Sequence, residues 1–309
     1  MRKILLYATV LIFIGAGPAF ADKIGVSIAN FEGNFLTVLR NSMQKYASSI
    51  PGVNLQIEDA QNNVSKQVDQ VQRFIAQGFD AIIVIPVGTD ATPAITKLAV
   101  EAAVPLVYVN RMPSDNPLPA KVSFVGSNEV DSGTLQMQQV CKLMGGKGSI
   151  VVLMGDPATQ PARQRIQDIY DVIARPECAA IQVVAERTGN WDGVQGEDLM
   201  TNWISSGLQF DAVVAHNDEM AIGAIKALKG AGYDMNKVIV AGIDATKEGL
   251  AAMKAGELDV TVFQDAVAQG SSAVDTARRL AKGESVKPVI WVPYELVTPE
   301  NMDPYLAKN

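Results

Sequence analysis

Short apolar runs of strand length alternate with longer stretches of helical periodicity along most of the chain. In one helical stretch, Val64, Val68, Val71 and Ile75 recur every three or four positions and share one face. The predicted strands cover residues 23–29, 53–58, 81–85, 106–109, 149–154, 181–186, 212–215, 238–241 and 260–263. The predicted helices cover residues 34–48, 64–77, 91–102, 129–144, 162–174, 194–206, 247–254 and 266–281, and a further helix follows Glu219. Residues 121–125 are predicted as a short crossing segment and residues 288–293 as a final extended segment.

Strands that alternate with helices predict parallel sheets built from βαβ units. The chain contains two rounds of such units, which predicts an α/β fold with two doubly wound lobes. In open α/β sheets, ligands bind at the carboxyl ends of the strands. The loops that follow the predicted strands are therefore where functional residues are expected.

The stretch from Phe210 to Leu228 predicts a strand, a polar turn and a helix in succession. Asn217 lies in the polar turn, where its side-chain oxygen can cap the helix. The same amide offers two donors and an acceptor, which suits a hydroxylated ligand at a strand end. The stretch alone leaves both roles open for Asn217.

The other loops at predicted strand ends carry aromatic rings, amides, carboxylates and arginines. Flat rings can cover the apolar C–H faces of a sugar, and planar polar groups can form paired hydrogen bonds with its hydroxyl groups. This mixture, repeated over seven loops, favours a binding site for a sugar-like ligand. Single residues have other roles open to them: Phe35 and Trp191 in the core, Asp244 as a helix cap, and Arg111 and Arg165 in surface ion pairs.

Residues 1–21 have the pattern of a secretory signal peptide. Arg2 and Lys3 precede an apolar core from Ile4 to Ile14, and Ala19-Phe20-Ala21 has the small residues of a cleavage site. The apolar core is shorter than the about 20 residues that span a bilayer. Because no later stretch reaches that length, we expect a soluble, exported protein.

Composition narrows the function further. The formal net charge of −7, without any basic run, argues against binding to nucleic acid or to an anionic membrane surface. Cys141 is predicted late in a helix and Cys178 just before a strand, so a disulfide between them is possible in an exported protein. Two buried free thiols are the alternative. A metal site is not expected, because there is no CxxC motif and His216 is the only histidine.

Five stretches of the chain carry a family resemblance: IGVSI at 24–28, DAQNN at 59–63, VPLVYVNR at 104–111, NDEMAIGA at 217–224 and GID at 242–244. Together they resemble the periplasmic sugar-binding proteins of ABC importers, the type I group that includes ribose-binding and glucose/galactose-binding proteins. The resemblance extends over almost all of residues 22–300. It implies two Rossmann-like lobes with a ligand cleft between them and three hinge crossings, near residues 126, 263 and 292. The first lobe would comprise residues 22–126 and 264–292, and the second residues 127–263 and 293–309.

The resemblance also implies which residues bind the ligand. They match the family's two aromatic walls, its ring-gripping arginine and the polar groups that follow its strands. They are Phe35 and Trp191 as the walls, Arg165 as the arginine, Asn110 and Arg111 after the fourth strand, and Asn217, Asp244 and Gln264 at the remaining strand ends.

The expected pocket mixes the patterns of two sugar classes. Gly33 stands where glucose/galactose-binding proteins have an acid, and residues 144–148 lack their calcium loop. Leu36 follows Phe35 where ribose-binding proteins have a second phenylalanine. Arginine directly after Asn110, with few carboxylates expected around it, is similar to the cyclitol-binding branch of the family. Myo-inositol or a related cyclitol is therefore the leading ligand, and an aldose of the ribose or glucose/galactose type is the alternative.

The resemblance implies a periplasmic protein, expected to be a monomer, that closes over its ligand and delivers it to the permease subunits of an ABC transporter. It implies no cofactor and no chemistry on the ligand, and a role in presenting ligand to a chemoreceptor stays open. A secreted carbohydrate-modifying enzyme is disfavoured by the lack of a nucleophile elbow. A DNA-binding regulator would need a helix-turn-helix at the amino end, where residues 1–21 have the signal pattern instead.

Overall fold

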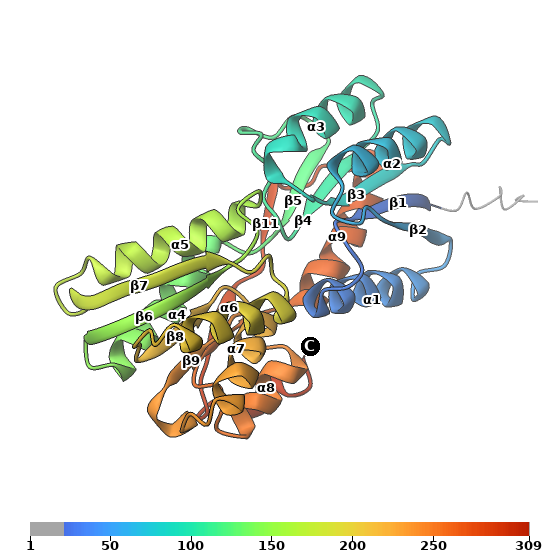
Figure 1. Cartoon of the computed structure of the whole chain (residues 1–309). Coiled ribbons are helices and arrows are strands. Elements are labelled where there is room, and N and C mark those ends of the chain that lie inside the picture. Colours follow the sequence, from blue (N-terminus) through green and yellow to red (C-terminus); the bar gives the residue numbers. More distant parts are fainter. Residues whose placement is uncertain (1–21, 309) are drawn as a thin grey trace, which may run out of the picture.

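The computed structural model of the chain describes residues 22–308, which form two α/β lobes (Figure 1). The signal peptide predicted for residues 1–21 lies outside the described residues. The prediction of an α/β fold with two doubly wound lobes is confirmed. Within residues 22–308, every helix is too short or too polar to cross a membrane.

The first lobe is built around a six-stranded sheet in the order β11-β5-β4-β3-β1-β2, in which every neighbouring pair is parallel. Helices α1 (Asn34–Ser48) and α9 (Ala266–Ala281) cover one face of the sheet. Helices α2 (Val64–Ala76) and α3 (Thr92–Glu101) cover the other face (Figure 1). The strands are β1 Asp22–Ile28, β2 Val53–Asp59, β3 Ala81–Ile85, β4 Leu106–Val109, β5 Val122–Gly126 and β11 Val289–Trp291.

Apolar side chains on both faces of this sheet fill two separate cores. Ile83 on β3 packs on the side of α1 and α9, whereas its neighbour Ile82 packs on the side of α2 and α3. Successive side chains of a strand point to opposite faces, so a sheet covered on both faces needs apolar residues at nearly every position. This requirement explains why its strands read as continuous apolar runs in the sequence.

One segment differs from the sequence prediction, and a second is extended as predicted but belongs to a sheet. The predicted crossing segment at residues 121–125 is instead mostly β5, which is buried because β4 and β11 pair with it on its two sides. The predicted extended segment at residues 288–293 contains β11, which belongs to the first lobe, and is followed directly by β12, which belongs to the second. Neither arrangement has a local sequence signal, because each depends on partners that are distant along the chain.

The second lobe has a four-stranded parallel sheet in the order β7-β6-β8-β9. An antiparallel pair, β10 and β12, continues it through isolated bridges from Ala241 to Val260 and from Asp244 to Phe263. The strands are β6 Lys147–Met154, β7 Ala180–Thr188, β8 Ala212–Ala215, β9 Ile239–Ala241, β10 Thr261–Gln264 and β12 Tyr294–Val297.

Five α-helices of the described chain cover this second sheet. They are α4 Glu129–Leu143 and α5 Gln160–Ile173 on one face, and α6 Gly193–Ser205, α7 Asp218–Gly230 and α8 Lys247–Lys254 on the other. Short 3-10 turns complete the two lobes at Thr89–Ala91, Met235–Lys237 and Asp303–Tyr305.

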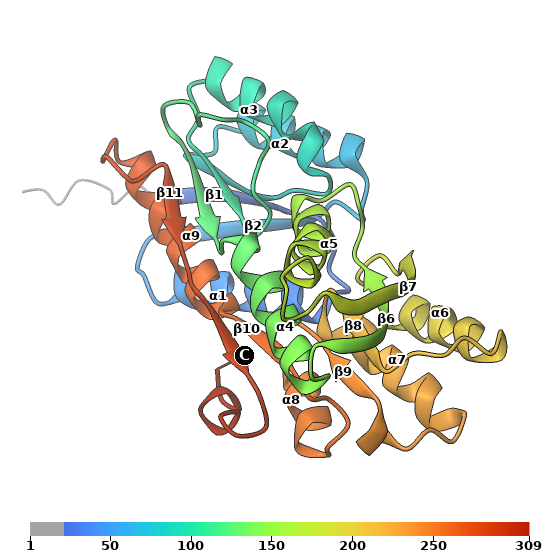
Figure 2. The ribbon, with the colours of Figure 1, turned by 90° about the vertical axis from the view of Figure 1, so that its left-hand side faces the viewer.

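Three segments connect the lobes within residues 22–308. They are residues 127–128 between β5 and α4, Asp265 between β10 and α9, and residues 292–293 between β11 and β12. Figure 2 shows β11 and the segment after it running from the first lobe into the second. Away from these connections, Cys141 in α4 and Cys178 just before β7 form a disulfide, with their Cα atoms 5.8 Å apart. It links α4 to an edge strand of the second sheet.

Candidate functional site

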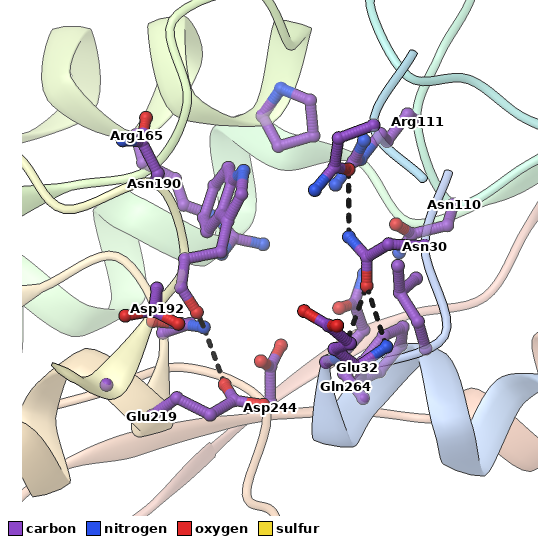
Figure 3. Close-up of a pocket in the computed structure, with 18 of the residues that line it drawn as sticks. Asn30, Glu32, Asn110, Arg111, Arg165, Asn190, Asp192, Glu219, Asp244 and Gln264 are labelled. Atoms are coloured by element: carbon purple, nitrogen blue, oxygen red, sulfur yellow. Dashed lines mark hydrogen bonds between the residues drawn. The ribbon is translucent and has the colours of Figure 1, made fainter. Parts of the chain in front are cut away.

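A cavity of about 380 Å³ lies between the two lobes, at the carboxyl ends of strands from both sheets. Figure 3 shows Asn30, Asn110 and Arg111 facing it from the first lobe, and Arg165, Asp192 and Glu219 from the second. All eight residues predicted to bind a ligand line it: Phe35, Asn110, Arg111, Arg165, Trp191, Asn217, Asp244 and Gln264. The family resemblance had named these eight residues, and they come together because the carboxyl ends of parallel strands converge.

Arg165 on α5 is buried and held by protein groups on all three nitrogen atoms. Its Nε donates to Glu129 Oε2 at 3.0 Å and also lies 3.2 Å from the Ser132 hydroxyl. Its Nη1 donates to the carbonyl oxygen of His216, and its Nη2 donates to the Tyr294 hydroxyl at 3.0 Å. A guanidinium carries five N–H groups, so two remain for a ligand. The ion pair with Glu129 is buried, which corrects the alternative of a surface ion pair.

The charge of Arg165 is fixed by its neighbours. Burial lowers the pKa of Arg165, but the carboxylate of Glu129 raises it, and the net result lies above the ordinary value. Tyr294 closes the network, because its hydroxyl donates to Glu129 Oε1 at 2.8 Å and accepts from Gln264 at 2.8 Å. Glu129 and Tyr294 were not predicted from the sequence.

Arg111 reaches the cavity from the first lobe by a different arrangement. It follows β4 and Asn110, whose backbone adopts a left-handed φ of 66°. Its Nη1 donates to the carbonyl oxygens of Pro86 at 2.7 Å and Val87 at 3.2 Å. Burial lowers the pKa of Arg111 to about 10, so it stays charged at neutral pH. No carboxylate among the described residues forms an ion pair with it, so the surface ion pair considered from sequence is not present here either.

The two aromatic walls belong partly to the cavity and partly to the cores. Phe35, in the first turn of α1, packs in a core of the first lobe. Trp191 packs against the second lobe, at a left-handed φ of 67°. Its ring lies directly over Gly155, where an added Cβ would approach the ring to 2.1 Å. The absence of a side chain at Gly155 therefore leaves the space that the Trp191 ring occupies.

His216 lies fully buried behind Trp191. Burial, and next the charge of Arg165, lowers the pKa of His216 to about 3, so the ring is neutral. Its Nδ1 accepts from the Gly155 N–H at 3.2 Å, which places the proton on Nε2. Within the described chain, His216 Nε2 and Trp191 Nε1 are buried without a hydrogen-bond partner.

Asn217 caps α7, as the sequence suggested, through an acceptor bond from the Met220 N–H at 3.2 Å. Its Nδ2 donates to the Trp191 carbonyl oxygen at 3.1 Å and to Glu219 Oε2 at 2.5 Å. The amide that was expected to meet a ligand is therefore largely engaged by the protein. It positions Trp191 and Glu219, which both line the cavity.

Asp244 stands on the cavity floor (Figure 3). It does not cap α8, because Thr246 is the N-cap of that helix and accepts from the Gly249 N–H at 3.0 Å. Burial raises the pKa of Asp244 well above its ordinary value, although the charge of Arg165 opposes this. Its φ of 120° belongs to a backbone conformation that favours glycine, so the surrounding loop must be held firmly.

Asp218, which was predicted in the polar turn but not among the ligand-binding residues, holds that loop. It is fully buried and accepts from the Thr246 N–H at 2.7 Å and from the Thr261 hydroxyl at 2.8 Å. Gly242 and Gly249 leave the space that its carboxylate occupies, since an added Cβ would lie 2.3 Å and 2.2 Å from its oxygen atoms. Asp218 thus connects the start of α7 to the loop that presents Asp244.

The cavity lining also holds ionisable and amide groups that were not on the predicted list. Few carboxylates were expected around Arg111, but five acids line the cavity, with Arg111 and Arg165 as its two arginines. Of the acids, Asp244 was predicted and Glu32, Glu129, Asp192 and Glu219 were not; the added amides are Asn30, Asn62, Asn190 and Gln195. Across residues 22–308, no group of three or more His, Cys, Asp or Glu has an arrangement that would hold a metal ion.

Comparison with known proteins agrees with this architecture. Residues 24–285 match the family model described as the periplasmic binding protein domain. A protein of Rhizobium meliloti, provisionally named a rhizopine-binding protein, is 54% identical over 310 residues, which is 100% of both chains. A solute-binding protein of an ABC transporter from Bacillus halodurans, solved with bound myo-inositol, shares 42% identity and a TM-score of 0.89, covering 95% of this chain and 100% of its own.

A more distant structure shows the same lobe arrangement. The Caulobacter myo-inositol binding protein bound to myo-inositol shares 29% identity and a TM-score of 0.88, covering 94% of this chain and 98% of its own. The family consists of binding proteins rather than enzymes. With a family match over most of its length and a polar cavity between two doubly wound lobes, the chain belongs to the periplasmic binding protein family, among the sugar-binding proteins of ABC transporters.

Proposed function

We propose that this protein captures myo-inositol or a related cyclitol in the periplasm and delivers it to the permease of an ABC transporter. The observation that carries the proposal is the cavity itself, which both lobes line with aromatic walls and two buried arginines. A cyclitol has hydroxyl groups around its whole ring, so it can meet polar groups of both lobes at once. The bound myo-inositol in the Bacillus halodurans relative supports the same ligand class.

In this proposal both lobes contribute ligand contacts. Arg111 and Asn110 bind hydroxyl groups from the first lobe, and Arg165, Asp244 and Gln264 bind them from the second. Phe35 and Trp191 cover the two faces of the ring, while Asn217 positions the second wall. Because the ligand contacts both lobes, it favours the closed arrangement in proportion to its differential affinity.

The lobe boundaries proposed from the sequence, 22–126 with 264–292 and 127–263 with 293–309, put the hinges near residues 126, 263 and 292. The ends of β5 and β11, at Gly126 and Trp291, support this assignment, whereas β10 ends at Gln264 and so shifts the second boundary by one residue. Export through cleavage after Ala21, a monomeric state, the absence of catalysis and a chemoreceptor as a second partner belong to the same proposal.

A second ligand candidate, a cyclitol that carries an ammonium group, is favoured by the excess of carboxylates. Glu129 pairs with Arg165 at 3.0 Å, which leaves Arg111 as the remaining cation of the lining. The positive charge of Arg111 faces four further acids of the lining, Glu32, Asp192, Glu219 and Asp244. An ammonium group would add the missing positive charge and would favour the ionised form of Asp244.

A titration panel on residues 22–309 tests both candidates. Myo-inositol, an inosamine, its neutral N-acetyl derivative, ribose, glucose and galactose are compared by calorimetry and by thermal unfolding. At one hundred times the dissociation constant, the correct ligand should stabilise the fold by about 2.7 kcal/mol. A preference for myo-inositol over the inosamine supports the first candidate, and the reverse preference, lost on acetylation, supports the second. Binding of an aldose alone would overturn both, and the absence of any binding would overturn the transport proposal.

A pair of variants tests the assigned contacts. Arg111→Ala should weaken binding by about 10- to 100-fold, because it removes hydrogen bonds from a charged donor. Lys97→Ala is the matched control, since Lys97 lies on the outer surface with 74% of its side chain exposed. Equal affinities of the two variants would contradict the role of Arg111.

A further inference from the structure

Glu219 connects the two lobes beside the cavity. It lies in the first turn of α7 in the second lobe, yet its Oε1 accepts from the Asn34 N–H at 2.8 Å, at the start of α1 in the first lobe. The N-cap residue of α1 is Gly33, which has no side chain to satisfy the first amides of the helix. A carboxylate from the opposite lobe therefore supplies the cap that α1 lacks in its own sequence.

The carboxylate is held in this position from its own lobe. Asn217 Nδ2 donates to Glu219 Oε2 at 2.5 Å, while Asn217 Oδ1 caps α7. Glu219 is thus anchored on one oxygen and reaches across the cleft with the other. The partial positive charge at the amino end of α1 adds to the attraction, because helix amino ends favour anions.

The position of this contact relates it to ligand binding. Glu219 and Asn217 line the cavity, and so does Phe35, the residue after Asn34. The bond from Glu219 to α1 exists only when the lobes are close together, because its two partners belong to different lobes. We propose that Glu219 is a positioning residue for lobe closure, a carboxylate of one lobe that caps helix α1 of the other and holds the closed form around an occupied cavity.

A second contact across the cleft provides a comparison. Arg163 Nη2 lies 3.2 Å from Asp90 Oδ1, with 43% and 79% of the two side chains exposed. An exposed ion pair of this kind contributes little and is screened by salt. Glu219, in contrast, lies in the cavity wall and meets the end of a helix. Its removal should therefore affect closure far more than removal of Asp90.

The inference rests on the proposed function for its ligand, but lobe closure can be measured without one. Both cysteines of the chain are in the disulfide, so two introduced cysteines give unique labelling sites. Lys97→Cys on α3 and Lys254→Cys on α8 are exposed and lie on different lobes. Energy transfer between dyes at these sites reports the closed fraction in single molecules, with and without the ligand found in the panel.

Glu219→Ala should reduce the closed fraction of the ligand-free protein and raise the ligand dissociation rate, each by about five- to tenfold. The unfolding temperature of the ligand-free protein should fall only slightly, because the open form lacks the bond to Asn34 and loses only the bond to Asn217 within the second lobe. A purely structural role for Glu219 would lower that temperature and leave the closed fraction and the dissociation rate unchanged. Asp90→Ala, the control, should change the closed fraction and the ligand dissociation rate by less than twofold. An unchanged closed fraction and dissociation rate in Glu219→Ala would overturn the inference. If wild type binds no panel member, the proposed function fails, and the ligand-free closed fraction still decides the role of Glu219.

Discussion

Gly155 offers the sharpest test of how the second aromatic wall is positioned. An alanine Cβ at this position would lie 2.1, 2.2 and 2.3 Å from three atoms of the Trp191 ring. Ordinary contacts of this type begin near 3.4 Å, so Gly155→Ala requires the ring to move by more than 1 Å. The backbone cannot easily absorb the change, because Gly155 N–H is bonded to His216 and follows directly on β6.

Two effects should follow from Gly155→Ala. Overpacking in a well-packed region costs about 1–3 kcal/mol of unfolding free energy. A displaced Trp191 should also weaken ligand binding by more than tenfold, because a ring moved by more than 1 Å enters the space of the ligand. Urea unfolding measures the first effect and calorimetric titration the second.

Gly230→Ala is the matched control. Gly230 ends α7, and an added Cβ there meets nothing within 4 Å. Replacing a helical glycine by alanine at an unstrained position should leave binding unchanged and stabilise the fold by a few tenths of a kcal/mol to about 1 kcal/mol. If Gly155→Ala behaved like Gly230→Ala in both measurements, the view that Gly155 fixes the wall would be refuted.

Three further predictions concern the buried charges and the disulfide. Arg165→Ala should lower the unfolding free energy by about 3–5 kcal/mol, because it leaves Glu129 buried without its cation. Chemical denaturation compares this variant with Arg165→Ala/Glu129→Gln, which should recover part of the lost free energy. A double variant as unstable as Arg165→Ala would contradict the prediction. Burial raises the pKa of Asp168 to about 7, so the folded protein keeps a proton that the unfolded chain releases near pH 4. The free energy of unfolding should therefore fall as the pH rises from about 4 to about 7. Urea unfolding at several pH values measures this slope, which Asp168→Asn should flatten. Replacing Cys141 and Cys178 by serine opens a loop with a sequence separation of 37 and should cost about 3–4 kcal/mol of stability, with ligand affinity retained because the disulfide is remote from the cavity lining.

Asp218 shows how a buried acid outside the cavity lining supports a residue of the site. Its carboxylate joins the start of α7 to the loop of Asp244 and to β10, three segments that are far apart in sequence. Asp244 can hold an unfavourable backbone conformation because these bonds over-determine the loop. The strained residue then presents its side chain to the cavity without further rearrangement on binding.

The alternation of strands and helices, and with it the two-lobed α/β fold, can be predicted from the sequence alone. The fold follows from local physics: hydrophobic periodicity specifies each element, and parallel strands bring the loops at their carboxyl ends together. The choice of eight residues from those loops came from the family resemblance, and all eight line one cavity. The cap on α7 by Asn217 was readable for the same reason, because a cap involves only neighbours along the chain.

How the polar groups are shared between the protein and the cavity depends on the packing of distant segments, which the sequence does not reveal. Glu129 and Glu219 stand in the first turns of α4 and α7, where acidic residues are common, and nothing local distinguishes their roles. Glu129 and its partner Arg165 are 36 positions apart in the sequence, and Glu219 and its partner Asn34 are 185 positions apart. Partners at such separations are chosen by the packing of the sheets and lobes, so periodicity and motif could not reveal them.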